Sequence, residues 1–163
     1  MSLLHPGDTF PQLTLNIPGA QAIQVPGWFA GEFGAVLFNR GAWCPYCTAQ
    51  LRSFQRAGDS LAQAGIRVAA LWVDDEQTTA AFTARHGLGF PLGHSADARA
   101  LAALTGAFVN DDPLYLQSTG FVLDPRGTVI VSVYSSGAIG RLVPEDVLGL
   151  VRYLREHAAA SSR

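Results

Sequence analysis

The first half of the chain contains short apolar segments separated by amphipathic stretches. Apolar and polar residues alternate over residues 9–17 and stop at Pro18-Gly19, which predicts a strand, and Pro11 favours an edge position because proline lacks an N–H donor. Residues 35–38 and 68–73 are continuous apolar runs, which are typical of strands buried on both faces. We therefore expect one edge strand followed by two central strands.

Apolar residues at helical spacing fill the segments between these strands. Pro45 suits a first helical turn, and the helix that it begins is expected to bend or weaken at Gly58 and to end at Gly65. Further helices are expected over residues 76–86, closed by Gly87, over residues 98–104, and from Pro144 onward, with fraying at residues 158–163.

Two strands in the last third of the chain are expected to form a hairpin. Residues 119–123 and 128–134 flank Asp124-Pro125-Arg126-Gly127, which carries proline and glycine at the second and fourth positions of a turn. Strands that alternate with helices, followed by a hairpin, predict an α/β fold. Its central β-sheet is mixed and flanked by helices, and the first strand is an N-terminal extension.

Composition narrows the class of protein. The chain has 163 residues, of which 48% are hydrophobic and 15% charged, with a formal net charge of −2. This length predicts one domain over residues 1–163. The near-neutral charge gives no sign of the basic surface that nucleic-acid binding requires. No segment has the pattern of a signal peptide or a membrane span. We therefore expect a cytoplasmic protein with neither nucleic-acid nor membrane partners.

The basic residues are all arginine, eleven in number, and the chain has no lysine. Schiff-base lysine chemistry, a lysine-containing phosphate loop and a kinase-type lysine are therefore excluded. The four histidines are spread along the chain, so we expect no metal site and no bound cofactor.

Both cysteines lie in Trp43-Cys44-Pro45-Tyr46-Cys47, between a predicted buried strand and a predicted helix. Three uses are open: a structural disulfide, a pair of zinc ligands, or redox chemistry. A structural disulfide across so short a loop would add little to the stability of the fold. Zinc binding is disfavoured because the histidines are not spaced as metal ligands. Unpaired N–H groups at a helix N-terminus favour a thiolate at Cys44, and Cys47 follows one turn later. The motif therefore favours redox chemistry.

Several weaker motifs follow one another in a recognisable order. They are residues 7–15 (GDTFPQLTL), residues 90–92 (FPL), Asp97 before a short helix that ends at Gly106, and residues 121–127 (FVLDPRG). This order resembles the AhpC/TSA peroxiredoxins, and residues 40–47 (RGAWCPYC) are similar to the peroxiredoxin-like branch that carries C-x-x-C. The resemblance covers nearly the whole chain and implies a thioredoxin-like fold.

The chain departs from the peroxiredoxin pattern Pro-x-x-x-Thr/Ser-x-x-Cys. Leu37 stands where the proline belongs, and Gly41 where the hydroxyl residue belongs. The arginine that precedes the family's Phe-Val-x-Asp strand is also missing, because residues 117–119 read Gln-Ser-Thr. Ser118 matches the position of the cis-proline of thioredoxins.

The resemblance implies a site and a reaction. Cys44 is expected to attack a hydroperoxide and become a sulfenic acid, and Cys47 to condense with it to a disulfide. An external thiol of the thioredoxin, glutaredoxin or glutathione type then reduces this disulfide. Arg40 is the best-placed cation to support Cys44, and Arg141 is a weaker candidate. Substrate is expected to contact Trp43, Pro45, Tyr46 and Ser118.

Two other functions stay open. One is a thiol–disulfide oxidoreductase of the thioredoxin or glutaredoxin kind, without significant peroxidase activity, which Cys-Pro-Tyr-Cys favours. The other is a non-enzymatic thioredoxin-fold module that senses redox state or binds zinc. A homodimer is compatible with each of these functions.

Overall fold

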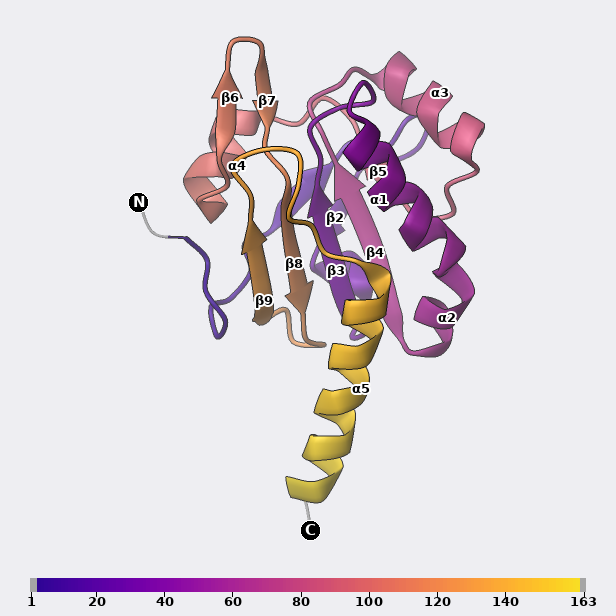
Figure 1. Cartoon of the computed structure of the whole chain (residues 1–163), viewed down its shortest axis with the longest axis vertical. Coiled ribbons are helices and arrows are strands. Elements are labelled where there is room, and N and C mark those ends of the chain that lie inside the picture. The colour runs from indigo at the N-terminus through magenta and orange to yellow at the C-terminus, as the bar shows by residue number, and fades with distance from the viewer. Residues whose placement is uncertain (1–2, 162–163) are drawn as a thin grey trace.

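A five-stranded mixed sheet lies at the centre of the computed structural model, which describes residues 3–161 and side chains up to residue 158 (Figure 1). Its strand order is β5-β4-β3-β8-β9. The first three strands in this order are parallel, and β8 and β9 are antiparallel to their neighbours. The strands are β3 (Phe33–Phe38), β4 (Ile66–Leu71), β5 (Leu92–Gly93), β8 (Thr119–Leu123) and β9 (Val129–Tyr134). The predicted α/β fold with a mixed sheet is confirmed.

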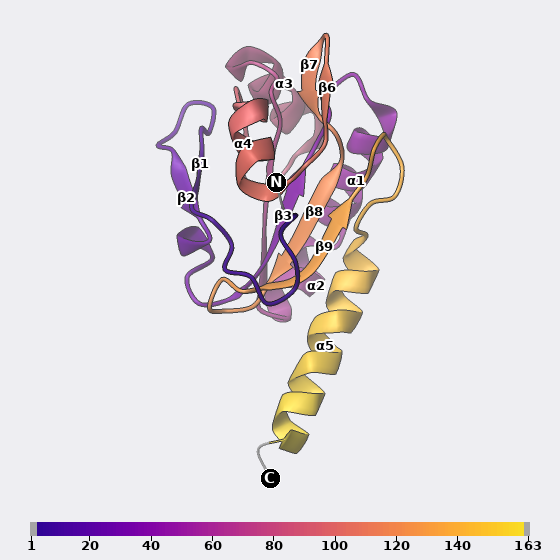
Figure 2. The same cartoon turned by 90° about the vertical axis from the view of Figure 1, so that its left-hand side faces the viewer.

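Both faces of the sheet are covered (Figures 1 and 2). One face packs against α1 (Pro45–Arg56), α2 (Gly58–Gln63), α3 (Glu76–His86) and α5 (Pro144–Ser161). The other face packs against α4 (Ala98–Thr105), the 3-10 helix η1 (Gly27–Phe29) and a hairpin of β1 (Leu13–Leu15) and β2 (Ile23–Val25).

The central strand β3 is apolar at every position from residue 34 to residue 38 because it supplies both cores. Val36 and Phe38 point into the core under β1 and α4, whereas Ala35 and Leu37 point into the core under α1 and α5. All four side chains are fully buried. The carboxyl end of this rigid strand leads directly into the cysteine motif.

Glycine residues set the ends of several helices as the sequence predicts. The helix that begins at Pro45 breaks before Gly58 into α1 and α2. Gly87, at φ +60°, ends α3, and Gly106, at φ +86°, ends α4. In this left-handed region glycine has no steric penalty, so both helices stop where expected.

Three short strands were not predicted. They are β2 and the two strands of a second hairpin, β6 (Val109–Asp111) and β7 (Leu114–Leu116), and each has only three residues. Three residues are too few to show an alternating pattern, so tertiary pairing decides them. The first predicted strand is likewise short, and it pairs with β2 outside the central sheet.

The C-terminal helix is longer than the sequence pattern predicts. α5 continues to Ser161 and projects beyond the end of the sheet (Figures 1 and 2). The helix thus includes residues 158–161, within the segment where the sequence predicts fraying, and residues 162–163 lie outside the described part. Within residues 3–161, no helix is both long and apolar enough to cross a membrane.

We expect Phe54→Ala to lower the free energy of unfolding by about 3–5 kcal/mol, because it leaves a cavity where α1 packs on the sheet. Phe54 is fully buried in that core. Urea unfolding followed by circular dichroism measures the effect. Tyr153→Ala is the control, since its ring is 54% exposed and its loss should change stability little. Equal losses in the two variants would contradict this packing.

Candidate active site

Cys44 lies at the junction of β3 and α1, where it is the N-cap residue of the helix. Pro45 occupies the first turn, in which the missing N–H costs nothing. The Cys44 sulfur accepts a hydrogen bond from the backbone N–H of Cys47 at 3.4 Å. The unpaired donors of a helix N-terminus therefore face the sulfur, as the sequence predicts.

Gly41 shapes the turn before Cys44. A Cβ atom built on this glycine would lie 2.2 Å from the Nε1 atom of Trp43, so the indole occupies the space that any side chain would need. The backbone N–H of Cys44 donates to the Gly41 carbonyl at 3.1 Å and closes the turn. Trp43 itself is 55% exposed and shields this side of the site.

Arg40 is held over the cysteine motif by contacts to two segments. Its Nη1 donates to the Cys44 sulfur at 3.6 Å, and its Nε donates to Gln117 Oε1 at 3.1 Å. Its Nη2 donates to the hydroxyl of Tyr115, on β7, at 3.1 Å. The guanidinium also lies 5.0 Å from the centre of the Trp43 ring. The sequence-based placement of Arg40 beside Cys44 thus agrees with the geometry.

Arg141 contacts both sulfur atoms, although the sequence marked it as the weaker candidate. Its Nη2 lies 3.0 Å from the Cys47 sulfur and 3.9 Å from the Cys44 sulfur. Its Nη1 donates to Gln50 Oε1 at 2.8 Å and to Asn39 Oδ1 at 3.2 Å. Two guanidinium groups from separate loops therefore reach one pair of thiols.

The supporting residues Asn39, Gln50 and Tyr115 were missed by the sequence analysis. A signal exists for two of them. Asn39 is a polar residue directly after a buried strand and is fully buried. Gln50 lies one helical turn after Cys47, on the buried face of α1. Tyr115 has no local signal, because it approaches Arg40 only through the β6–β7 hairpin.

The two thiols have opposite pKa shifts. Burial raises the pKa of Cys44, but hydrogen bonds from Cys47 and Arg40 and the positive charge of Arg141 outweigh it, so the pKa of Cys44 is lowered. Burial dominates at Cys47 and raises its pKa, although Arg141 and backbone N–H groups oppose the effect. Cys44 is therefore the more acidic thiol of the pair.

Both sulfur atoms are inaccessible to solvent, because Cys44 and Cys47 are 0% exposed. Tyr46 and Trp43 are more than half exposed at the surface above them. Ser118 lies just before β8, where its carbonyl accepts from Ser135, and its 2% exposure makes it a buried residue. The peptide bonds of Ser118 are trans, unlike the cis-proline bond of the thioredoxin position that it matches.

Asp74 fixes the turn from the other side of the motif. Its Oδ2 accepts a hydrogen bond from the backbone N–H of Ala42 at 2.7 Å. Burial raises the pKa of this carboxyl, the Ala42 bond lowers it, and the charge of Asp75 raises it further, with a net upward shift. Asp74 therefore joins the segment after β4 to the turn that precedes Cys44.

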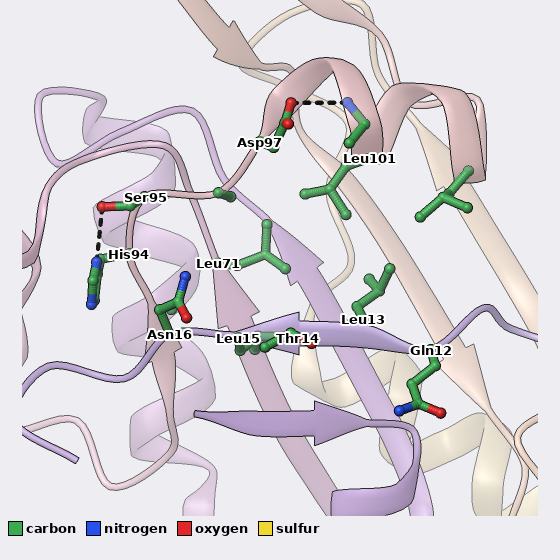
Figure 3. Close-up of a pocket in the computed structure, with 14 residues that line it drawn as sticks. Gln12, Leu13, Thr14, Leu15, Asn16, Leu71, His94, Ser95, Asp97 and Leu101 are labelled. Atoms are coloured by element: carbon green, nitrogen blue, oxygen red, sulfur yellow. Dashed lines mark hydrogen bonds between the residues drawn. The ribbon is translucent and has the colours of Figure 1, made fainter. Parts of the chain in front are cut away.

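A hollow of about 250 Å³ lies between β1, the loop after β5 and α4 (Figure 3). Its lining includes Leu13, His94 and Asp97, and shares no residue with the thiol cluster. Among the residues that the structure describes, no three His, Cys, Asp or Glu side chains gather as metal ligands.

Comparison with protein families gives one match. The model of the AhpC/TSA family matches residues 6–132. Among curated protein sequences, none matches the chain significantly.

Solved peroxiredoxin structures share the fold at low sequence identity. A mutant of the peroxiredoxin 6 of Arenicola marina has a TM-score of 0.80 at 16% identity, covering 95% of this chain and 75% of that one. Peroxidoxin BcpB from Mycobacterium tuberculosis has a TM-score of 0.79 at 18% identity, covering 92% and 97%. AhpC of Mycobacterium bovis has a TM-score of 0.78 at 22% identity, covering 95% and 94%. At these identities the likeness concerns the fold alone.

We expect Arg40→Met to raise the pKa of Cys44, because it removes a charge-assisted hydrogen bond to the thiolate. Arg141→Met should raise the pKa of both thiols. Thiolate absorbance at 240 nm, followed as the pH changes, measures both values in the reduced protein. Arg67→Met is the matched control, since Arg67 stacks on Trp28 away from the thiols. An unchanged titration in both arginine variants would contradict the assigned contacts.

The stability of the reduced protein should depend on pH in two opposite ways. Between the lowered pKa of native Cys44 and the ordinary thiol value of about 8.5, only the unfolded chain holds that proton, so stability rises with pH. Between about 8.5 and the raised pKa of native Cys47, only the native state holds the proton, so stability falls.

Urea unfolding of the reduced protein at several pH values checks both limbs of this dependence. Relative to wild type, Cys44→Ser should flatten the rising limb, and Cys47→Ser should flatten the falling limb. Parallel profiles for all three proteins would show that neither thiol titrates as described.

Proposed function

Because the chain belongs to the AhpC/TSA family, whose members are thiol peroxidases, we propose that it reduces hydroperoxides through Cys44 and Cys47. The observation that carries this proposal is the pair of guanidinium groups that reach the two sulfur atoms. A lowered thiol pKa alone speeds attack only slightly, because nucleophilicity falls together with basicity. Donors aimed at the developing charge supply the larger effect.

In the first step, the Cys44 thiolate attacks the terminal oxygen of the hydroperoxide. An S–O bond forms, the O–O bond breaks, and the leaving oxygen takes up a proton and departs as an alcohol or water. Negative charge grows on that leaving oxygen during the step. Arg40 and Arg141 stand beside Cys44 with charged N–H donors, which suits them to stabilise this charge.

In the second step, Cys47 resolves the sulfenic acid on Cys44. Its sulfur attacks the Cys44 sulfur, an S–S bond forms, and hydroxide leaves with a proton as water. Cys47 has to lose its own proton first, and Arg141 at 3.0 Å favours the resulting thiolate. An external thiol donor then returns the disulfide to the dithiol.

A thiol–disulfide oxidoreductase is the second candidate function. Gly41 leaves the site without the hydroxyl that peroxiredoxins carry, and a low-pKa Cys44 is a good leaving group from a mixed disulfide. The burial of both sulfur atoms favours the peroxidase instead, because a small hydroperoxide reaches a buried sulfur more readily than a protein disulfide does. The peroxidase therefore remains the favoured proposal.

Stopped-flow mixing of the reduced protein with a hydroperoxide, followed by Trp43 fluorescence, tests the proposal. We expect reaction far faster than that of a free thiol, loss of this phase in Cys44→Ser, and a rate about 10²-fold lower in Arg40→Met. Cys47→Ser should react at first and then stay as a sulfenic acid that dimedone traps.

The matched measurement uses a model protein disulfide in place of the peroxide. Fast reduction of the disulfide, together with peroxide reactivity no greater than that of free cysteine, would reject the peroxidase in favour of the second candidate. Arg67→Met serves as the charge control, since it removes an arginine that contacts Trp28 rather than the thiols.

A further inference from the structure

Gln50 joins α1, the helix of the cysteine motif, to the loop after β9, which carries Arg141. Its Oε1 accepts a hydrogen bond from Arg141 Nη1 at 2.8 Å, and its Nε2 donates to the backbone carbonyl of Leu142 at 2.9 Å. The side chain is only 7% exposed. One buried amide therefore uses both of its polar ends on two neighbouring residues of a loop that has neither helix nor strand.

The Gln50 contact helps to decide which way the Arg141 guanidinium faces. Asn39 Oδ1 accepts from the same Nη1 at 3.2 Å, so two amides hold one side of the group. Because the guanidinium is planar, these bonds direct Nη2 to the Cys47 sulfur at 3.0 Å. The Cys44 sulfur lies farther from Nη2, at 3.9 Å. Arg141 therefore acts mainly on Cys47.

Arg40 is held by a separate set of groups. Its Nε and Nη2 donate to side chains of the segment before β8 and of β7, and its Nη1 contacts the Cys44 sulfur at 3.6 Å. Gln50 takes no part in these hydrogen bonds. A change at Gln50 should therefore reach Cys47 more strongly than Cys44.

The partners that hold Arg141 are uncharged. Apart from the thiols, they are amide and carbonyl oxygens. Among the residues that the structure describes, no carboxylate lies within ion-pair distance of Arg141 or Arg40. Asp146 lines the same hollow of about 320 Å³ as Arg141, but it is exposed and forms no such pair. A carboxylate partner would offset the guanidinium charge, whereas an amide leaves that charge to act on a sulfur.

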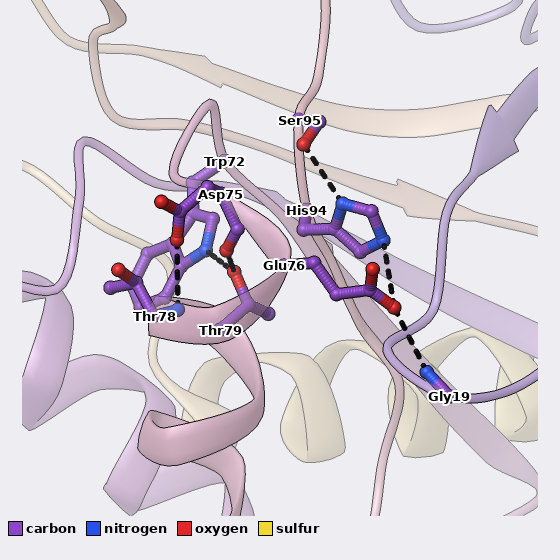
Figure 4. Close-up of polar contacts among 8 residues, drawn as sticks. All are labelled: Gly19, Trp72, Asp75, Glu76, Thr78, Thr79, His94 and Ser95. Carbon is purple, nitrogen blue, oxygen red and sulfur yellow. Dashed lines mark hydrogen bonds and ion pairs between the residues drawn. The ribbon is translucent and has the colours of Figure 1, made fainter.

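The acidic residues that follow β4, the neighbour of β3 in the sheet, are engaged elsewhere. Asp74 accepts from the backbone N–H of Ala42 at 2.7 Å. Asp75 caps α3, and Glu76 accepts from the backbone N–H of Gly19 at 3.1 Å (Figure 4). None of these three carboxylates pairs with an arginine beside the sulfur atoms.

We propose that Gln50 is a positioning residue for the resolving step: its uncharged amide holds Arg141 against Cys47 and leaves the guanidinium charge to that sulfur. The inference rests on the proposed function, which includes resolution by Cys47. Because Cys47 attacks as a thiolate, a cation 3.0 Å from its sulfur favours the form that reacts.

The resolving step balances within the protein. The Cys47 thiol loses its proton, and its sulfur attacks the sulfenic sulfur of Cys44. The S–S bond forms as the S–O bond breaks, and the oxygen leaves as hydroxide. The proton lost by Cys47 balances this hydroxide, so one water molecule is released.

The first test measures the pKa of Cys47 alone, in the Cys44→Ser protein, from thiolate absorbance at 240 nm. Gln50→Glu should raise this pKa by about 1, because a carboxylate beside Arg141 offsets the charge that favours the thiolate. Gln50→Met removes both hydrogen bonds but adds no charge, so its shift should be smaller. A role in holding the loop alone predicts the opposite order, since glutamate keeps an acceptor for Arg141 and methionine does not.

The second test follows Trp43 fluorescence when the dithiol variants are mixed with a hydroperoxide. The phase whose rate does not depend on peroxide concentration reports resolution. In Gln50→Glu, a pKa higher by about 1 lowers the thiolate fraction about tenfold, and the greater nucleophilicity of a more basic thiolate returns about threefold. Resolution should therefore slow about threefold. The peroxide-dependent phase should change less, and the deficit in resolution should shrink as the pH rises.

Gln55→Glu is the matched control, because it adds the same charge to α1 away from Arg141. Gln55 Oε1 accepts from the backbone N–H of Gly89 at 2.6 Å, and glutamate keeps that acceptor. The pKa of Cys47 and the rate of resolution should both stay at their wild-type values.

Asn39→Asp provides an independent variant, because it places a carboxylate on the other amide partner of Arg141 Nη1. It should act in the same direction as Gln50→Glu, and it decides the test if circular dichroism shows that Gln50→Glu is misfolded. An unchanged Cys47 pKa or resolving phase in the folded carboxylate variants, or a larger pKa shift in Gln50→Met, would overturn the role of Gln50. If hydroperoxides leave both thiols reduced while Gln50→Glu still raises the Cys47 pKa, the peroxidase is rejected and the Gln50–Arg141 arrangement is kept.

Discussion

The site depends on favouring the thiolate form of Cys44 at a position that water does not reach. A buried charge is costly unless fixed donors and opposite charge replace its hydration. Here a helix N-terminus, Arg40 and Arg141 together take that role at Cys44. A chain without lysine has arginine as its one permanently cationic side chain. The planar guanidinium also suits the task, because its separate N–H groups bind a sulfur and the protein at once. Each arginine uses this property, Arg40 toward Gln117 and Tyr115, and Arg141 toward Gln50 and Asn39.

The departures from the peroxiredoxin pattern are linked to one another by contacts. Gly41 stands where the family carries a hydroxyl, and the Trp43 indole fills the space beside it. Gln117 stands in the segment where the family carries an arginine, and its side chain accepts a hydrogen bond from Arg40. Gln117 thus lies in the segment that lacks the family's arginine, and it orients Arg40, which supplies the positive charge instead. Trp43 and Tyr115 complete the arrangement, since their rings meet edge to face at 4.9 Å and both lie close to the Arg40 guanidinium. A hydroxyl side chain restored at residue 41 would therefore collide with Trp43 before it could reach substrate.

Local sequence was sufficient where a local rule decides the structure. The buried strands, the break at Gly58, the ends of α3 and α4, and the placement of Cys44 at a helix N-terminus all follow from short patterns or from single turn residues. The three-residue strands could not be predicted, because pairing between distant segments of the chain determines them. Arg141 was undervalued for the same reason, since 94 residues separate it from Cys47, and only the loop after β9 brings the two together. The contact of Tyr115 with Arg40 likewise depends on the β6–β7 hairpin, and no periodic pattern in the sequence predicts that hairpin. The cysteine pair could be predicted, whereas its cationic surroundings required the fold.

The Arg141 contact with both cysteines also affects the reduction potential of the dithiol–disulfide couple. A disulfide carries no charge, so oxidation removes the anion that the guanidinium and the helix end are arranged to hold. Every contact that favours the Cys44 thiolate therefore favours the reduced form over the oxidised one. For this two-electron couple, about 1.4 kcal/mol of such preference moves the reduction potential by about 30 mV in the oxidising direction. The Cys44–Cys47 disulfide should thus be easier to reduce than a structural disulfide.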